Sequence, residues 1–430
     1  MSGMIETLKN AFKIPDLRKK LLFTLMILVV YRIGTRVPVP GIDAEAFTSL
    51  IERVGQLGSF LDIISGGAFS QVSIFAMGIT PYINASIIMQ LLTVAIPTLE
   101  RLQKEGEQGR KKIQQYVRYL TVALALVQAT AYWFTTRSAA ASSLPFALNA
   151  LLVILSFTAG TAFIMWLGEQ INEFGIGNGI SLIIFAGIVA RGPDAVVLIF
   201  RYFQQWTVTR NILVALFGTI VVAGVFIATV ALVVFVQMAE RRIPIQYAKK
   251  VVGRKMYGGQ STYLPIKVNQ AGVIPVIFAI SIVTLPSTLV SFFGGTGPIA
   301  QWFMNFAQNP VYYVAYGLLI LGFTFFYSMI QFNPVEVANN LQKNGGFIPG
   351  IRPGRPTADF IHRTSRRLSW FDGMFLVLVV LFPTLLSAIT GMTGIWFGGT
   401  AVLIMVGVSI DLVNQLESQM VMRHYKGFLD

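Results

Sequence analysis

The sequence predicts an all-α membrane protein with about ten transmembrane helices, and two observations predict this class. Of its 430 residues, 54% are hydrophobic and only 12% are charged, whereas soluble domains carry about 25% charged residues. Apolar segments long enough to cross a bilayer recur from near residue 21 to near residue 413. This leaves no room for a large soluble domain, and one membrane domain is expected.

The spans are placed where long stretches of the chain are poor in charge, because a spanning helix needs about 20 apolar residues. The expected spans are 20–36, 70–96, 118–136, 148–169, 177–191, 211–238, 269–292, 311–331, 372–391 and 395–413. The first span follows a basic cluster, as a signal peptide would. Arg32 and Arg36 stand where a small-residue cleavage site belongs, so the span is expected to be retained.

Lysine and arginine set the direction of the spans, because they concentrate on the cytoplasmic side. With the N-terminus inside, the cytoplasmic segments hold 26 of the 33 lysines and arginines, and the outer segments hold 7. Both termini are therefore predicted to be cytoplasmic. The loops 240–267 and 333–370 are long as well as basic, which favours a docking surface for an acidic or RNA-containing partner.

The predicted membrane interior lacks ionisable residues over long stretches. No Asp, Glu, Lys or Arg occurs in 70–97, 268–335 or 373–410. This weakens an ion-coupled transporter, whose coupling sites commonly use intramembrane charges, without excluding one that binds an uncharged solute or Na⁺ through carbonyl groups. The chain has no cysteine, and no predicted span contains a histidine, so catalysis, a cofactor and a metal site are not expected.

Ten spans predict two inverted pseudo-repeats of five helices, an arrangement that places a pathway between the halves. The expected parts are a cytoplasmic segment 1–20, halves 21–208 and 209–413, and a cytoplasmic tail 414–430. Gly78-Ile79-Thr80-Pro81-Tyr82-Ile83 in span two and Gly272-Val273-Ile274-Pro275-Val276-Ile277 in span seven share Gly-x-x-Pro-x-Ile. Each proline is expected to kink its helix, so the two helices are candidates for a seam that parts.

Polar but uncharged residues follow these prolines, and ordinary hydrogen bonds between helices explain them equally well. They are Asn84, Ser86, Gln90, Asn269, Gln270, Ser281 and Thr284. The segment 59–69 before span two is too short and too rich in glycine to cross a bilayer. It is either a re-entrant or capping segment or an interfacial helix.

Several motifs together resemble the SecY family of protein-translocation channels, and they occur in order along nearly the whole chain. They are Ser-Gly-Gly-Ala at 65–68 with the following run to residue 88, Gly-Ile-Gly-Asn-Gly-Ile-Ser at 175–181, Gln-Ser-Thr at 260–262, Leu-Pro-Ile-Lys-Val-Asn-Gln-Ala-Gly-Val-Ile-Pro at 264–275, Gly-Ile-Arg-Pro-Gly at 350–354 and Phe-Gly-Gly-Thr at 397–400.

The resemblance implies an hourglass of ten helices with a plug, a lateral gate between spans two and seven, and a central aliphatic ring. The implied ring is Ile83, Ile87, Ile184, Ile188, Ile277 and Ile404. The implied plug is Phe60, Leu61, Asp62, Ile63, Ile64, Ser65, Gly66 and Gly67. The implied gate residues are Pro81, Asn84, Ser86, Gln90, Pro275, Ser281 and Thr284. A narrow aliphatic collar excludes ions by dewetting and fits loosely around an extended chain.

The resemblance also implies a bacterial plasma-membrane location and a set of partners. These are the small membrane subunits SecE and SecG, the SecA motor ATPase, the ribosome through its RNA, signal peptides and nascent chains, and the lipid bilayer. The implied docking residues are Arg241, Arg242, Lys249, Lys250, Arg254, Lys255, Arg352 and Arg355. Two alternatives are an inverted-repeat secondary transporter of a small solute and a membrane scaffold that binds partners without conduction.

Overall fold

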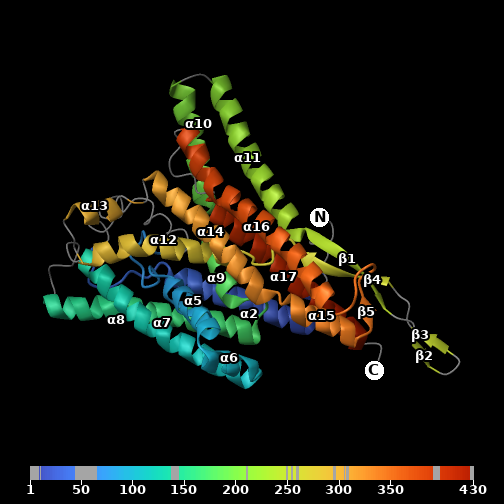
Figure 1. Ribbon diagram of the computed structural model, residues 1–430. Helices are drawn as coiled ribbons and strands as arrows, with labels where there is room; N and C mark the ends of the chain where they lie inside the picture. Colours follow the sequence, from blue (N-terminus) through green and yellow to red (C-terminus); the bar gives the residue numbers. More distant parts are fainter. Residues whose placement is uncertain are drawn as a thin grey trace. The chain divides into compact units, whose positions relative to one another are not determined.

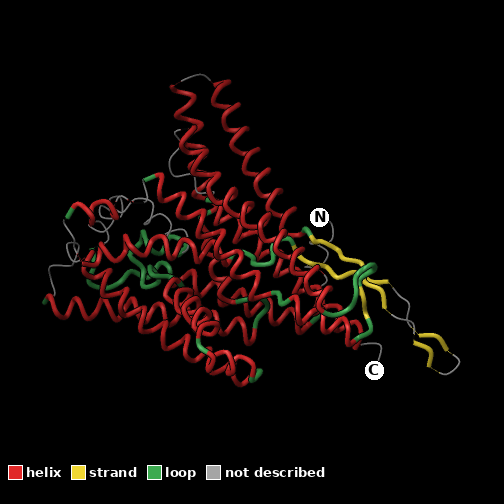
Figure 2. The backbone as a smooth tube through the Cα atoms, viewed as in Figure 1, coloured by secondary structure: helices red, strands yellow, loops and turns green. Residues whose placement is uncertain are grey.

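The computed structural model describes residues 9, 11–43, 65–136, 145–209, 212–247, 250–252, 255–257, 261–293, 297–304, 306, 309–390 and 398–426. The chain forms two compact units. Unit 1 comprises Met1–Tyr202, Thr284–Asn309 and Val408–Asp430, and unit 2 comprises Phe203–Val283 and Pro310–Gly407. Helices dominate both units (Figures 1 and 2). The chain passes between the units within α10, α12 and α17, and the expected division into two halves near residue 208 stays a prediction.

Unit 1 is helical, and several of its helices begin at residues suited to a helix start. Its helices are α2 (Pro15–Gly34), α5 (Thr80–Ala95), α6 (Pro97–Lys104), α7 (Glu107–Thr136), α8 (Phe146–Phe174), α9 (Gly179–Ala190), the first part of α10 (Gly192–Thr209), α13 (Pro298–Met304) and the last parts of α12 (Ile274–Phe293) and α17 (Gly399–Lys426). Proline lies in the first turn of α2, α5 and α6, where its missing N–H costs nothing. The Asn178 side chain caps α9 by accepting from the N–H groups of Ile180 and Ser181.

A turn segment at residues 65–79 fills the interior of unit 1 between these helices. Phe75 is buried at 2% exposure, and its ring stacks on Tyr31 of α2 at 6.0 Å between centroids. Glycine permits the close packing: a Cβ on Gly34 would lie 2.0 Å from the Phe75 ring, and one on Gly160 of α8 would lie 2.0 Å from the carbonyl oxygen of Ile74. Span two therefore becomes helical only at Thr80, so the expected helix over residues 70–79 is wrong.

Unit 2 combines long helices with a small sheet. The helices are α11 (Ile212–Met238), the first part of α12 (Ile274–Phe293), α14 (Pro310–Gln331), α15 (Pro334–Lys343), α16 (Arg355–Thr390) and the first part of α17 (Gly399–Lys426). Strands β1 (Glu240–Tyr247), β4 (Ser261–Lys267) and β5 (Gly346–Phe347) form an antiparallel sheet in the order β4-β1-β5. Strands β2 (Lys250–Val252) and β3 (Lys255–Tyr257) pair separately.

The sheet has its own hydrophobic core, which joins the two long segments 240–267 and 333–370. Ile243 and Ile245 of β1 are buried together with Ile266 of β4, Leu341 of α15 and Ile361 of α16. The exposed residues of β1 alternate with these two isoleucines, as in a sheet with one face on a core. The sequence analysis described 240–267 and 333–370 as loops and did not predict these strands or α15.

The helices agree with a multi-pass membrane protein. Six helices in the described ranges are long and apolar enough to span a bilayer, and a seventh is formed if α5 and α6, which meet at 101°, are one broken span. Each expected span contains a helix. Span one, α2, is not among the six because charged residues occupy both its ends, and the apolar part of α12 is short. The helical membrane class is confirmed, and ten spans remain the expected total.

Candidate functional site

Four of the six implied ring isoleucines lie on two helices of unit 1. Ile83 and Ile87 are four residues apart on α5, so they share one face, as do Ile184 and Ile188 on α9. Ile87, Ile184 and Ile188 are buried, and Ile83 is partly buried. Each pair therefore presents adjacent branched aliphatic side chains, as a dewetting collar requires.

The other two ring isoleucines lie in unit 2. Ile277 occupies the first turn of α12 and is partly buried, and Ile404 lies on α17 and is buried. All six positions are helical and none is fully exposed to the surroundings. Closure of the six into one ring stays a prediction.

The last residues of the implied plug are held against the C-terminal end of α2. The Tyr31 hydroxyl donates to the carbonyl oxygen of Ser65 at 3.1 Å, and the Arg32 guanidinium donates to that of Gly66 at 2.7 Å. Gly66 and Gly67 have φ of 66° and 86°, which favours glycine. A Cβ on Gly66 would lie 2.8 Å from the Cα of Gly187, one residue before Ile188 of the implied ring.

This anchor was not predicted from the sequence, where Arg32 only marked the absence of a cleavage site. Phe60, Leu61, Asp62, Ile63 and Ile64 lie outside the described residues. The structure therefore shows how the C-terminal base of the implied plug is attached, and the plug itself stays a prediction.

The implied gate prolines do not kink their helices. Pro81 lies in the first turn of α5, and Pro275 lies in the first turn of α12. A proline there starts a helix, because the N–H that it lacks has no partner within the helix. The predicted kinks at Pro81 and Pro275 are wrong. The proline inside α12 is Pro286, which the sequence analysis did not single out.

The polar gate residues differ in what they contact. The Ser281 hydroxyl donates to the carbonyl oxygen of Ile277 in its own helix at 2.9 Å, as serine does on a buried helix face. Asn84, Ser86 and Thr284 are partly buried, and Gln90 is exposed. α5 belongs to unit 1, whereas α12 is divided between the units at Val283 and Thr284, and the gate stays a prediction.

A buried polar network in unit 2 was missed by the sequence analysis as a connected site. The Gln270 side-chain oxygen accepts from Ser328 of α14 at 2.8 Å and from Ser365 of α16 at 3.0 Å. Ser369 donates to the Ser328 hydroxyl at 2.6 Å. The four-residue spacing of Ser365 and Ser369 was the available signal, since it places both on one helix face. The network attaches the segment leading into α12 to two long helices.

Four of the implied docking arginines lie on unit 2. Arg241 and Arg242 are exposed on β1, and Arg352 and Arg355 are exposed at the turn that begins α16. The Thr357 hydroxyl donates to the Arg352 carbonyl oxygen at 2.9 Å, and Ile351 packs on the core beneath β1. One hydrophobic core therefore supports both pairs of arginines.

The remaining docking residues are less well described. Lys249 and Arg254 lie outside the described residues, and only the backbone of Lys250 and Lys255 is described. These two lysines belong to the paired strands β2 and β3. They stay predictions.

The basic residues of α6 and the start of α7 differ from the docking arginines because their charges are partly paired. Lys104 contacts Glu100 at 2.6 Å and Lys111 contacts Glu107 at 2.9 Å. The bond from each lysine lowers the pKa of its glutamate below the ordinary value. By contrast, Arg242 reaches Glu240 only at 3.9 Å. The arginines of β1 are therefore the better placed for an external anion.

Metal binding has no evident site in the structure as described. Across those residues, no cluster of three or more His, Asp or Glu side chains has the geometry to hold an ion. The functional candidates are thus aliphatic, polar or cationic surfaces.

Comparison with known proteins gives the family. The family model described as SecY matches residues 73–413. A curated relative from Streptomyces scabiei, named protein translocase subunit SecY, is 48% identical over 447 residues, covering 99% of this chain and 100% of the relative.

Two solved structures share the fold. One, from a study of the SecY plug domain, has a TM-score of 0.63 and 20% identity, covering 94% of this chain and 92% of the other. The other, Sec61 in a canine ribosome-channel complex, has a TM-score of 0.55 and 19% identity, covering 94% and 93%. The chain belongs to the SecY family.

Proposed function

We propose that this chain is the central channel subunit of a Sec translocon, which passes unfolded secretory proteins across the bacterial plasma membrane. The observation that carries the proposal is the 48% identity, along essentially the whole of both chains, to a protein translocase subunit. The chain is proposed to act as a passive conduit and not as an enzyme. The motor SecA or the translating ribosome supplies the energy.

The chemistry of the implied ring supports this role. Six isoleucines offer no hydrogen bond to a substrate, so they favour no particular sequence. A constriction of such side chains loses water when it is empty, which blocks ions. The proposed plug adds a second barrier, and the bonds of Tyr31 and Arg32 hold its base.

The proposed lateral gate lies between α5 and α12 and releases transmembrane segments into lipid. Neither helix contains Asp, Glu, Lys, Arg or His, so exposing them to lipid leaves no charge in hydrocarbon. The Gln270 network supports this proposal because it attaches the start of α12 to α14 and α16, which would give a moving helix a fixed end.

The arginines of β1 and of the turn before α16 are the proposed docking surface for SecA or ribosomal RNA. Arg355 begins α16, where a cation is unfavourable by about 0.3–1 kcal/mol because of the helix dipole. A partner's carboxylate or phosphate would offset that cost and accept paired bonds from the guanidinium. The Sec61 structure with a similar fold is itself a ribosome complex. SecE and SecG are the proposed small membrane partners.

Cysteine crosslinking tests the pathway, because the chain has no native cysteine. Ile87→Cys and Ile277→Cys are each expected to form a disulfide with a cysteine in a stalled secretory chain. Ile227→Cys on α11, where the isoleucine is 66% exposed, is the control and is expected to form none. The readout is the shifted band on a non-reducing gel.

Absence of a bond at both isoleucines would contradict the channel if the complex is correctly inserted and bound to its motor. Saturable uptake of a small solute by the same vesicles would then favour the transporter.

A further inference from the structure

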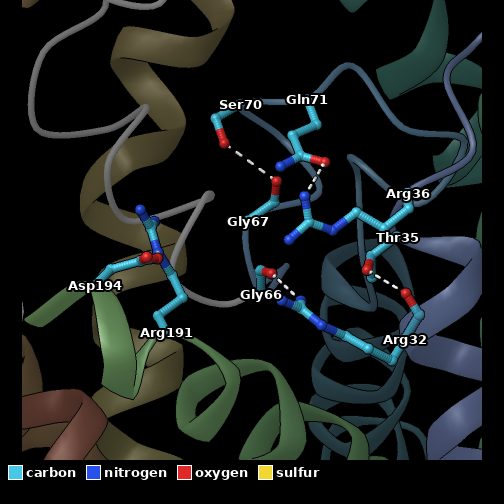
Figure 3. A pocket seen from close by; sticks show the side chains of 9 residues that line it. All are labelled: Arg32, Thr35, Arg36, Gly66, Gly67, Ser70, Gln71, Arg191 and Asp194. Carbon is cyan, nitrogen blue, oxygen red and sulfur yellow. Dashed lines mark hydrogen bonds and ion pairs between the residues drawn. The ribbon is translucent and has the colours of Figure 1, made fainter.

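A small pocket in unit 1 gathers positive charge at the end of α2 that follows the apolar span. It is lined by Arg32, Thr35, Arg36, Gly66, Gly67, Ser70, Gln71, Arg191 and Asp194, with a volume of about 60 Å³. Figure 3 shows Arg32 of α2 and Arg36, which follows the end of that helix, on one side and the Arg191–Asp194 pair on the other. Three guanidinium groups face one carboxylate, so the lining is cationic.

The location makes this charge unusual. In the predicted topology the pocket is on the outer side, where the positive-inside rule disfavours lysine and arginine. Only 7 of the 33 basic residues are outside, and three of those seven line this one pocket. Such a concentration needs a reason other than setting the orientation of the spans.

The arginines are held in place by protein contacts and retain donors. Arg32 donates to Gly66 at 2.7 Å, and Arg36 donates to the Gln71 side-chain oxygen at 3.1 Å. Each guanidinium has five N–H donors, and each of these bonds uses one. Asp194 lies 3.6 Å from Arg191 and is exposed, so it neutralises only part of the charge.

The pocket also has room for a small ligand. A water needs about 10–15 Å³ of such space, so about 60 Å³ admits a group the size of a tetrahedral oxyanion. The Ser70 hydroxyl lines it but donates its proton to the Gly67 carbonyl oxygen at 3.1 Å, so the arginines supply the donors for a ligand. Gly67 has open space where a Cβ would be. Paired guanidinium donors suit phosphate oxygens.

We infer that this pocket binds a phosphate group, supplied by an anionic phospholipid of the outer leaflet or by free phosphate. The ends of the spans lie at the depth of the headgroups. Basic pockets between helices bind anionic headgroups on the cytoplasmic or matrix side of membranes, and the same chemistry applies to this pocket on the predicted outer side. Phosphate chemistry is common to both sources, and the assay below distinguishes them.

The test uses the purified full-length complex with its membrane partners. Native mass spectrometry measures the affinity for phosphatidylglycerol, with phosphatidylcholine as the neutral comparison. The variant Arg36→Gln/Arg191→Gln is expected to bind phosphatidylglycerol roughly tenfold more weakly, because charged hydrogen bonds from two guanidiniums are lost. Arg201→Gln, on α10 but outside the pocket lining, is the matched control and is expected to bind normally.

A second variant, Asp194→Asn, is expected to change the affinity for phosphatidylglycerol in the opposite direction. Asp194→Asn removes the one carboxylate of the lining, so it is expected to strengthen binding. This result cannot come from misfolding. A separate titration with inorganic phosphate in phosphatidylcholine nanodiscs, followed by ³¹P NMR, identifies free phosphate as the ligand if saturable binding appears and is lost in the double variant.

The inference is overturned if wild type, the double variant and Asp194→Asn bind phosphatidylglycerol equally and none binds phosphate saturably. Binding that is lost equally in Arg201→Gln also overturns it, because the charge of the whole outer surface would then be responsible. Neither result affects the proposed channel, which the crosslinking experiment tests separately.

Discussion

Gly66 and Gly67 adopt the same left-handed backbone conformation but have different surroundings. A Cβ on Gly66 would lie 2.8 Å from the backbone of Gly187, whereas one on Gly67 would meet no atom within 4 Å. Substitutions at the two adjacent glycines therefore distinguish two costs in stability: that of the backbone conformation, and that of a collision with α9. The contact matters because it joins the base of the proposed plug to the helix that carries Ile188.

Alanine at the two positions is expected to give different results. Gly67→Ala should cost about 1 kcal/mol for the left-handed conformation. Gly66→Ala should cost about 1–3 kcal/mol more, because α9 must shift to relieve the overlap. Thermal unfolding of the purified complex measures the loss of stability in each variant. Ion leakage through vesicles that contain the empty channel measures how far displacement of the plug base opens the channel. Equal stability and equal leakage in both variants would contradict the close contact.

At the scale of single residues, the sequence predicted which residues belong to the candidate site better than it predicted which residues contact one another. The isoleucines and the exposed arginines follow from the resemblance. The bond from Arg32 to Gly66 joins residues 34 positions apart, and no local pattern encodes such a pair. Pro81 and Pro275 were misjudged because a proline starts a helix or kinks one depending on where the helix begins, and that boundary was placed ten residues early in span two.

Among the elements, α12 is distinctive because its start is attached by side chains. Gln270 accepts bonds from α14 and α16 at once, so it holds the segment before α12 to two helices of unit 2. Long apolar runs predicted the helices well, since lipid leaves few alternatives. The strands of 240–267 were missed even though Ile243 and Ile245 alternate with Arg242, Pro244 and Gln246, because the segment was judged by its charge.

Loss of the Gln270 network is expected to loosen the start of α12. Ser365→Ala removes one bond and should lower the free energy of unfolding by about 1 kcal/mol. Gln270→Leu removes both bonds and leaves two buried hydroxyls with fewer partners, so it should cost about 2–3 kcal/mol.

Ser418→Ala is the control, because that hydroxyl is exposed and bonds only within its own helix. Denaturant titration of the purified complex measures all three variants. A Gln270→Leu protein as stable as the control would show that the network does not anchor α12.

For the whole molecule, the uneven distribution of lysine and arginine predicts the orientation of the spans in the membrane but not how the helices pack together. The basic sheet and the Arg352 turn share one core, which places both long loops on one side of the membrane. How the two units enclose a pore could not be predicted from the sequence, because hydropathy identifies spans and carries no information on which helices are neighbours.

Orientation is testable by single-cysteine labelling in whole cells. Arg242→Cys on β1 is expected to react with a membrane-impermeant maleimide only after the membrane is opened. Phe146→Cys at the start of α8, where the phenylalanine is 67% exposed, is expected to react in intact cells. The reverse pattern would invert the topology and move the arginine pocket to the cytoplasmic side.

The uncharged sequence of α5 and α12 has an electrical consequence. Neither helix contains Asp, Glu, Lys, Arg or His. Moving one elementary charge through a membrane potential of 100 mV is worth about 2.3 kcal/mol, and these helices carry no such gating charge. Separation of the two helices would be driven by binding energy and would respond little to voltage. A cell's membrane potential can therefore act on the charges of the passing polypeptide without also opening the proposed lateral gate.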